Sequence, residues 1–291
     1  MPRLPEYLKR PIINTETTKT VRKILNNKCL NTVCEGARCP NKNECYSKKT
    51  ATFLIMGNTC TRNCMYCNIS TSKPKPLDPD EPKHIAEAVK ELDLKYTVIT
   101  SVTRDDLPDG GASHFKNCIK EIRKISNTKI EILTPDFKLG NFNLPIKANA
   151  SLNIIIDARP DVFNHNIETV KNLFKTARPQ GNYDYSIEVL KYIKRNSDII
   201  TKSGLMVGLG ESIQEIEETV VDLKNAGVDI LTIGQYMQPS KAHLEVSKYY
   251  TLEEFDELKK LVKKIGINNY YIAPLVRSSY NAMSIWNKTN C

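Results

Sequence analysis

Short apolar runs alternate with longer amphipathic stretches from residue 50 onward. The short runs are rich in β-branched residues and nearly continuous in hydrophobicity, which is typical of strands covered on both faces, as in a parallel sheet. Strands are predicted at residues 50–57, 96–102, 129–135, 151–157, 201–208 and 229–236. Helices are predicted at residues 82–92, 112–126, 167–176, 185–195, 212–226 and 252–265.

Two helices carry clear signals at both ends. S/T-x-x-E strings that begin at Ser212 and Thr251 predict capping boxes ahead of an apolar face. Gly227 and Gly266 stand where the C-terminal caps of these helices are expected.

The order of these elements predicts the fold class. Repeated strand–helix units imply right-handed crossovers, and therefore an open doubly wound sheet or a full or partial barrel. No Gly-rich dinucleotide fingerprint follows the first strand, so we predict an α/β fold: a partial (β/α)6 TIM-type barrel over residues 50–270, with its site at the C-terminal ends of the strands. Residues 1–49 contain no convincing strand and are predicted to be an irregular extension that carries metal ligands. Residues 271–291 form a C-terminal tail that is expected to close the barrel mouth.

Composition and charge limit the cellular compartment and the kinds of partner that are expected for this chain. A mean hydropathy of −0.40, with no apolar run near 18 residues, excludes a transmembrane helix, so no membrane partner is expected. Because the N-terminus lacks a signal-like apolar stretch, the closely spaced cysteines predict a cytoplasmic chain whose thiols bind metal rather than form disulfides. The net charge is +9, and residues 1–50 contribute +7 of it. This basic segment is either a solvated surface or a docking site for an acidic macromolecule.

Cys60, Cys64 and Cys67, in a C-x3-C-x2-C string after the first predicted strand, form the more informative of two cysteine groups. Three thiolates in one short loop leave an iron of a [4Fe–4S] cluster open, and that iron can chelate S-adenosylmethionine. Tyr66 precedes the last cysteine and is placed to pack against adenine. The alternative is a zinc knuckle, which needs a fourth ligand; the nearest downstream histidine is His84.

Cys34, Cys39 and Cys45 form the second group, in a C-x4-C-x5-C string without a nearby fourth cysteine. Two three-thiol sites in one chain predict two [4Fe–4S] clusters and a redox enzyme that uses one cluster on behalf of the other. Cys118, on a predicted helix, is expected to fill the core. No cluster spacing includes the remaining cysteines, Cys29 and Cys291.

Polar residues and glycines after the predicted strands are candidate contacts of the cofactor. Gly110 and Gly111 would allow close backbone approach, Asn166 and Glu168 would hydrogen-bond ribose hydroxyls, and Arg178 would pair with a carboxylate. Any one of these residues, taken alone, is also explained as an ordinary surface residue. The prediction of a cofactor site therefore rests on all five residues together. Lower-ranked candidates at the same mouth are Arg104, Asp106, Leu209, Gly210 and Glu211, with His165 as a structural residue.

Taken together, these strings resemble the radical S-adenosylmethionine (SAM) superfamily and, within it, the lipoyl synthase family. The narrower resemblance rests on both cysteine groups and on RSSY at 277–280, TSVTRDDLPDGGA at 100–112, FNHNIETV at 163–170 and QYMQPS at 235–240. It covers the chain from residue 30 to 284.

The resemblance implies an activity and a ligand set. The enzyme would insert two sulfur atoms, at C6 and C8, into an octanoyl chain on a lysine of a lipoyl carrier domain, with the sulfur supplied by the auxiliary cluster. That cluster would be bound by Cys34, Cys39, Cys45 and a serine of RSSY, Ser279 in preference to Ser278. Its cofactors would be two [4Fe–4S] clusters and SAM.

The resemblance also implies partners: an octanoylated 2-oxoacid dehydrogenase E2 or glycine cleavage H protein, and a low-potential electron donor such as ferredoxin or flavodoxin. No nucleic acid is expected. Two alternatives stay open on the sequence alone: another two-cluster enzyme such as a methylthiotransferase, and a zinc-stabilised nucleic-acid-binding protein. A methylthiotransferase usually carries an added RNA-binding module, for which this chain has no residues left over.

Overall fold

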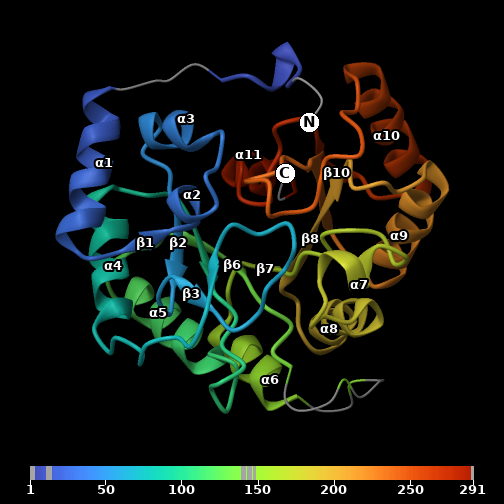
Figure 1. Ribbon diagram of the computed structural model, residues 1–291. Helices are drawn as coiled ribbons and strands as arrows, with labels where there is room; N and C mark the ends of the chain where they lie inside the picture. The colour runs from blue at the N-terminus through green and yellow to red at the C-terminus, as the bar shows by residue number, and fades with distance from the viewer. Residues whose placement is uncertain (1–3, 11–14, 139–141, 143–145, 147–148, 290–291) are drawn as a thin grey trace.

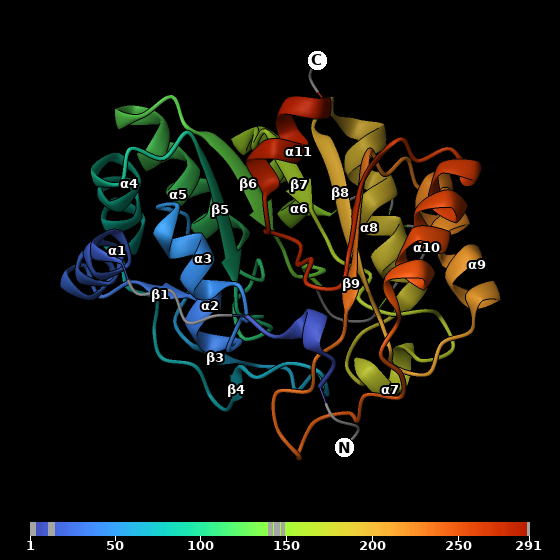
Figure 2. The same cartoon turned by 90° about the horizontal axis from the view of Figure 1, so that it is seen from above.

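One curved sheet of eight strands organises the molecule (Figures 1 and 2). The computed structural model describes residues 4–10, 15–138, 142, 146 and 149–289. Strand β1 (Asn31–Thr32) pairs antiparallel with β2 (Thr52–Ile55), and every later pairing in the sheet is parallel. In order across the sheet, the other strands are β5 (Tyr96–Ser101), β6 (Lys129–Leu133), β7 (Val162–Asn164), β8 (Ile200–Val207), β9 (Ile230–Gln235) and β10 (Asn269–Ile272). The mostly parallel α/β fold is confirmed, and no pairing joins β10 to β1 within the described residues.

Helices cover the outer face of the sheet, as crossover connections require (Figure 1). They are α4 (Glu81–Glu91), α5 (Ala112–Ile125), α6 (Ala150–Ala158), α8 (Tyr183–Asn196), α9 (Ile213–Asn225) and α10 (Leu252–Ile265). Both capping boxes predicted from the sequence are present, at Ser212 and Thr251. Gly227 and Gly266 have φ of 81° and 96°, the left-handed conformation that ends a helix.

The strand predicted at residues 151–157 is wrong, because this segment forms α6. Asn149 caps the helix by accepting a hydrogen bond from the backbone N–H of Leu152. A short apolar run fits a buried helix as well as a buried strand. The strand that takes this place in the sheet is β7, only three residues long.

The helix predicted at residues 167–176 is also wrong, apart from the single turn of α7 (Phe174–Ala177). Glu168 has a φ of 69° and runs alongside β8 instead. Its N–H donates to the carbonyl of Gly204, and its carbonyl accepts from the N–H of Met206. These two hydrogen bonds hold Glu168 beside β8 and keep this segment out of a helix.

The N-terminal extension is more regular than predicted. It contains a short 3-10 helix, η1 (Glu6–Leu8), and the helices α1 (Glu16–Asn27), α2 (Val33–Gly36) and α3 (Lys42–Ser47). Its two-residue strand β1 is part of the main sheet, so the expectation of no strand was wrong. Helix α1 buries one apolar face, which attaches the extension to the core.

The C-terminal tail reaches both ends of the sheet. Helix α11 (Ala282–Thr289) lies at the opposite end of the strands from the small sheet of β3 (Thr59–Cys60) and β4 (Ser70–Thr71) (Figure 2). There Ala282 and Trp286 pack with Tyr96 and Val98. Only the segment before α11 therefore lies near the C-terminal ends of the strands. No helix among the described residues is both long and apolar enough to cross a membrane.

Candidate active site

A cavity of about 490 Å³ opens at the C-terminal ends of the parallel strands. Its walls come from segments that are far apart in the sequence: the N-terminal extension, the loop after β2, the ends of β5 to β9, and the tail before α11. All six grouped cysteines line it. We call Cys60, Cys64 and Cys67 the loop trio, and Cys34, Cys39 and Cys45 the N-terminal trio.

The loop trio sits in a segment whose two ends are held together. Strand β3, which includes Cys60, pairs in parallel with β4, so the two ends of the loop lie side by side. The N–H of Cys67 donates to the carbonyl of Cys64 (3.0 Å). The sulfur of Cys60 accepts two backbone N–H groups, from Arg62 at 3.4 Å and from Thr103 at 3.3 Å. Two backbone donors are therefore directed at this sulfur.

Two members of the N-terminal trio lie in short helices, and Cys39 lies between these helices. Cys34 lies in α2, where the Thr32 hydroxyl accepts the N–H of Glu35, and Cys45 lies in α3. The amide of Asn41, between these helices, is buried and donates to the carbonyl of Leu275 in the tail (2.7 Å). The extension is thereby fastened directly to the segment that precedes RSSY.

The chemistry of these thiols suits iron–sulfur clusters. Burial raises the pKa of Cys34 to about 11 and those of Cys45 and Cys67 to about 12, and it also raises the pKa of Cys64. Iron binds the thiolate, so these buried thiols would release protons when they bind metal. All six cysteines are free of disulfides. Each of two segments supplies three soft donors at this cavity, the number that a [4Fe–4S] cluster with one open iron takes, while among the described residues no three such groups lie close enough together to hold one metal ion.

The RSSY segment approaches the sheet through two glycines inside strands. A Cβ at Gly234 would lie 2.1 Å from the carbonyl oxygen of Val276, and one at Gly204 would lie 2.6 Å from the hydroxyl oxygen of Ser278. The Ser278 hydroxyl donates to the side-chain oxygen of Asn166 (2.7 Å). Only residues without a Cβ leave room for this close packing.

Ser279 lines the cavity, and its hydroxyl has no hydrogen-bond partner within the described residues. Arg277 lies near both Cys39 and Glu168; burial lowers the pKa of its guanidinium, and these two groups act in the opposite direction. Tyr280 donates its hydroxyl to Glu44 (2.9 Å). The tail thus contacts both the N-terminal trio's helices and the predicted cofactor contacts.

Four of the predicted SAM contacts line the cavity together: Tyr66, Asn166, Glu168 and Arg178. The amide of Asn166 donates to Glu168 (3.1 Å), and the guanidinium of Arg178 donates to the Asn166 carbonyl (3.3 Å). Burial raises the pKa of Glu168, while the Arg178 charge opposes that shift. The Nε of Arg178 has no partner within the described residues, so a donor remains for a ligand.

Gly110 and Gly111 lie elsewhere. Both have positive φ and begin α5 against Phe137 and Met56, outside the cavity lining. His165, which was predicted to be structural, lines the cavity, whereas none of the lower-ranked candidates is among the lining residues. Its Nε2 has no partner within the described residues, and burial lowers its pKa to about 4.

Three of the lower-ranked candidates form hydrogen bonds with the backbone or with each other. Arg104 and Asp106 pair with each other, and Glu211 accepts the N–H groups of Gly208 and Leu209. Cys118 is fully buried, which confirms it as core, and Cys29 is exposed. Cys291 lies outside the described residues.

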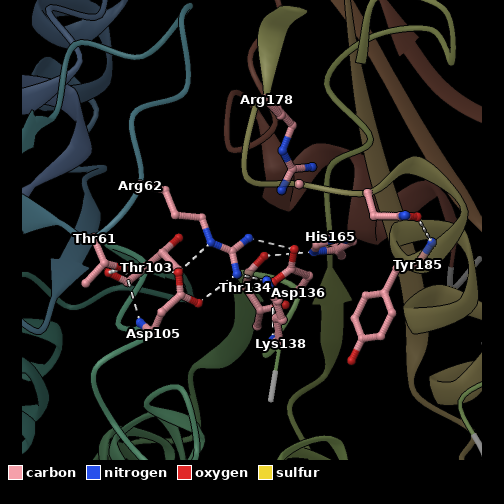
Figure 3. Close-up of polar contacts among 12 residues, drawn as sticks. Thr61, Arg62, Thr103, Asp105, Thr134, Asp136, Lys138, His165, Arg178 and Tyr185 are labelled. Carbon is pink, nitrogen blue, oxygen red and sulfur yellow. Dashed lines mark hydrogen bonds and ion pairs between the residues drawn. The ribbon is translucent and has the colours of Figure 1, made fainter. Parts of the chain in front are cut away.

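Two residues that the sequence reasoning missed hold the loop trio in place. Arg62, inside the C-x3-C spacing, pairs with Asp105 and Asp136 (Figure 3). His243 places its Nε2 3.0 Å from the carbonyl oxygen of Cys67, and its Nδ1 contacts the Ser240 hydroxyl. The position of Arg62 between two cysteines was a usable signal, whereas nothing local marks His243.

A curved parallel sheet with a three-cysteine loop at the C-terminal ends of its strands defines a radical SAM enzyme. Residues 54–223 accordingly match the family model for the Radical SAM superfamily. The chain is 46% identical over 281 residues to a lipoyl synthase of Caldanaerobacter subterraneus subsp. tengcongensis, covering 96% of each chain. It is 49% identical over 282 residues to lipoyl synthase 2 of Nostoc sp., covering 96% of this chain and 94% of that one. The chain therefore belongs to the lipoyl synthase family of radical SAM enzymes.

Solved structures agree at the level of the fold. The crystal structure of methylornithine synthase (PylB) superposes with a TM-score of 0.56 at 12% identity, covering 86% of this chain and 74% of that one. Streptococcus suis SuiB gives the same TM-score at 14% identity, covering 79% of this chain and 52% of SuiB. This chain thus spans about half the length of SuiB.

Proposed function

We propose that the chain inserts two sulfur atoms, at C6 and C8, into an octanoyl chain attached to a lysine of a lipoyl carrier domain. The observation that carries this proposal is that both cysteine trios and Ser279 line one cavity. An extended acyl-lysine arm can enter such a cavity while the carrier domain stays outside. Near-full-length similarity to two curated lipoyl synthases supports the same activity.

The two trios would have different tasks. The loop trio would hold a [4Fe–4S] cluster with one open iron, and the N-terminal trio with Ser279 would hold the auxiliary [4Fe–4S] cluster that supplies sulfur. When bound, the first cluster and SAM together supply hydrogen-atom abstraction from unactivated C–H bonds. The engagement of the Ser278 hydroxyl with Asn166 supports Ser279 as the serine that binds iron.

The protein's own residues would bind and orient the cofactor and shield it from water. Asn166 and Glu168 would hydrogen-bond the ribose hydroxyls, Arg178 would pair with the carboxylate, and Tyr66 would pack against the adenine. Arg178 is buried, so its charge acts in a low-dielectric site and an incoming carboxylate is strongly favoured. Correct placement of the reacting carbons, rather than acid–base chemistry, is the main task of the site.

The partners follow from this activity. The carrier would be an E2 or H protein with an octanoylated lysine, and a low-potential ferredoxin or flavodoxin would supply electrons. The basic N-terminal segment is the proposed docking surface for an acidic carrier, because residues 1–50 hold most of the net positive charge.

The experiment compares metal content and product formation in matched serine variants. The anaerobically reconstituted chain should contain about eight irons and eight sulfides, as two cubane clusters require. Mass spectrometry of an octanoylated lipoyl domain should show the gain of two sulfur atoms. Ser279→Ala should lose iron and product, while Ser278→Ala should keep its iron. Stoichiometric zinc, or equal iron in both variants, would contradict the proposal.

A further inference from the structure

Arg62 lies between the first two cysteines of the loop trio, yet its side chain is turned inward and is only 4% exposed. Its guanidinium forms paired hydrogen bonds with two carboxylates (Figure 3). Nε and Nη2 donate to Asp105, both at 2.7 Å, and Nη1 and Nη2 donate to Asp136 at 2.7 and 2.8 Å. The two bidentate contacts use four of the five guanidinium N–H donors, a planar arrangement that a lysine cannot reproduce.

These two carboxylates lie in the loops that follow two neighbouring strands of the sheet. Asp105 follows β5, and Asp136 follows β6, so one side chain ties the cysteine loop to the ends of two neighbouring strands. Asp136 is fully buried and also accepts the N–H of Lys138 at 3.3 Å. Breaking a buried pair of this kind is costly, because a charge would remain without compensation.

Backbone contacts beside Arg62 extend the attachment to the sulfur of Cys60. The N–H of Thr61 donates to the carbonyl of Thr103 (3.1 Å), and the N–H of Asp105 donates to the Thr61 hydroxyl (3.1 Å). The same two chain segments supply the N–H groups of Arg62 and Thr103 that point at the Cys60 sulfur. The Arg62 side chain and the neighbouring backbone therefore hold the groups around the Cys60 sulfur in one geometry.

We propose that Arg62 is a positioning residue for the proposed SAM-binding cluster: it clamps the cysteine loop onto β5 and β6 and keeps two N–H donors directed at Cys60. The inference rests on the proposed function of the loop trio. Hydrogen bonds to cluster sulfurs tune the reduction potential, and donors of this kind favour the reduced, more negative form. Loosening the clamp should lower the reduction potential and let iron leave faster.

The test uses the full-length, anaerobically reconstituted protein and the variant Arg62→Lys, which keeps the charge but loses the fork. Iron release to a ferrous chelator should be at least several-fold faster than in the wild type. The EPR signal that responds to added SAM should titrate at a more negative potential. Because the charge is unchanged, a shift in potential reports the donor geometry rather than the loss of a cation.

Two further variants complete the design. Asp105→Asn removes an acceptor at the partly exposed end of the clamp and should give an intermediate rate of iron release, even if Arg62→Lys folds poorly. Arg123→Lys breaks an arginine–aspartate contact with Asp161, far from the cysteine loop, and should behave as the wild type.

The outcomes separate this inference from the function on which it rests. A wild-type iron content in Cys60→Ala would overturn both the proposed cluster site and the role of Arg62. Iron lost in Cys60→Ala, together with an unchanged potential and release rate in Arg62→Lys, would overturn only the role of Arg62. A potential shift in Arg123→Lys equal to that in Arg62→Lys would also count against the clamp.

Discussion

A buried ion pair beneath the cavity offers a sharp test of how the interior is stabilised. Lys202 on β8 contacts both carboxylate oxygens of Glu131 on β6, at 2.9 and 3.0 Å, and both side chains are 1% exposed. Leu133 and Gly204, two residues further along the same strands, line the cavity. Because alternate residues of a strand face the same side, the pair lies directly below the cavity floor.

The expected loss of stability on removing Lys202 depends on how Glu131 is held. Its carboxylate also accepts from the Tyr96 hydroxyl (2.6 Å) and the Asn164 amide (2.9 Å). Lys202→Met leaves the carboxylate charge without a cation, which should cost about 3–5 kcal/mol. With typical stabilities of about 5–15 kcal/mol, this change should lower the melting temperature by on the order of 10 °C.

The double variant Glu131→Gln with Lys202→Met should be more stable than either single variant. Glutamine keeps an oxygen acceptor for the neighbouring donors, and no charge remains buried. Anaerobic thermal melts of the reconstituted protein measure these differences, with Lys194→Met, which breaks the more exposed pair with Asp229, as a control expected to cost less than about 1 kcal/mol. Strictly additive effects of the two single changes would refute the reasoning, because they would show that the pair is not coupled.

Two further predictions follow from the packing and the charges. Gly234→Ala should displace the Val276 carbonyl, which lies 2.1 Å from the added Cβ, and should lower iron toward about four per chain; unchanged iron would contradict it. Burial raises the pKa of Asp161, but hydrogen bonds from the Ile130 N–H, Lys129 and Arg123 prevail and lower it. A lowered folded-state pKa contributes stability above the unfolded-state pKa and loses it as the pH falls through the folded-state pKa. Asp161→Asn should therefore be less stable at neutral pH by roughly 1–3 kcal/mol, with a gap that shrinks in acid; a pH-independent gap in the melts would argue against this.

Signals that act over a few residues were sufficient to predict much of the fold and to single out the proposed metal ligands. The capping boxes at Ser212 and Thr251 are present because a cap satisfies backbone groups within one turn. The two cysteine trios are recognisable because three donors around a cluster need short, fixed spacings.

Local patterns failed where burial or distant contacts decided the outcome. The apolar run at 151–157 forms a helix that buries one face only. Strand β7 occupies the place in the sheet that was predicted for this run. Gly110 and Gly111, predicted as cofactor contacts, precede a helix start against Phe137 and Met56 and lie outside the cavity lining. A glycine indicates close approach, and the sequence does not say to what.

The sequence by itself determined the chemistry of this protein: two sets of three thiols, the RSSY string, and an alternation of strands and helices that forms a parallel sheet. Only the tertiary structure decided which segments share one cavity. It brings the tail to the N-terminal extension through Asn41 and Leu275, which are 234 residues apart, and gives Arg62 partners 43 and 74 residues away. Contacts over such separations depend on how every intervening element packs, so no local spacing encodes them.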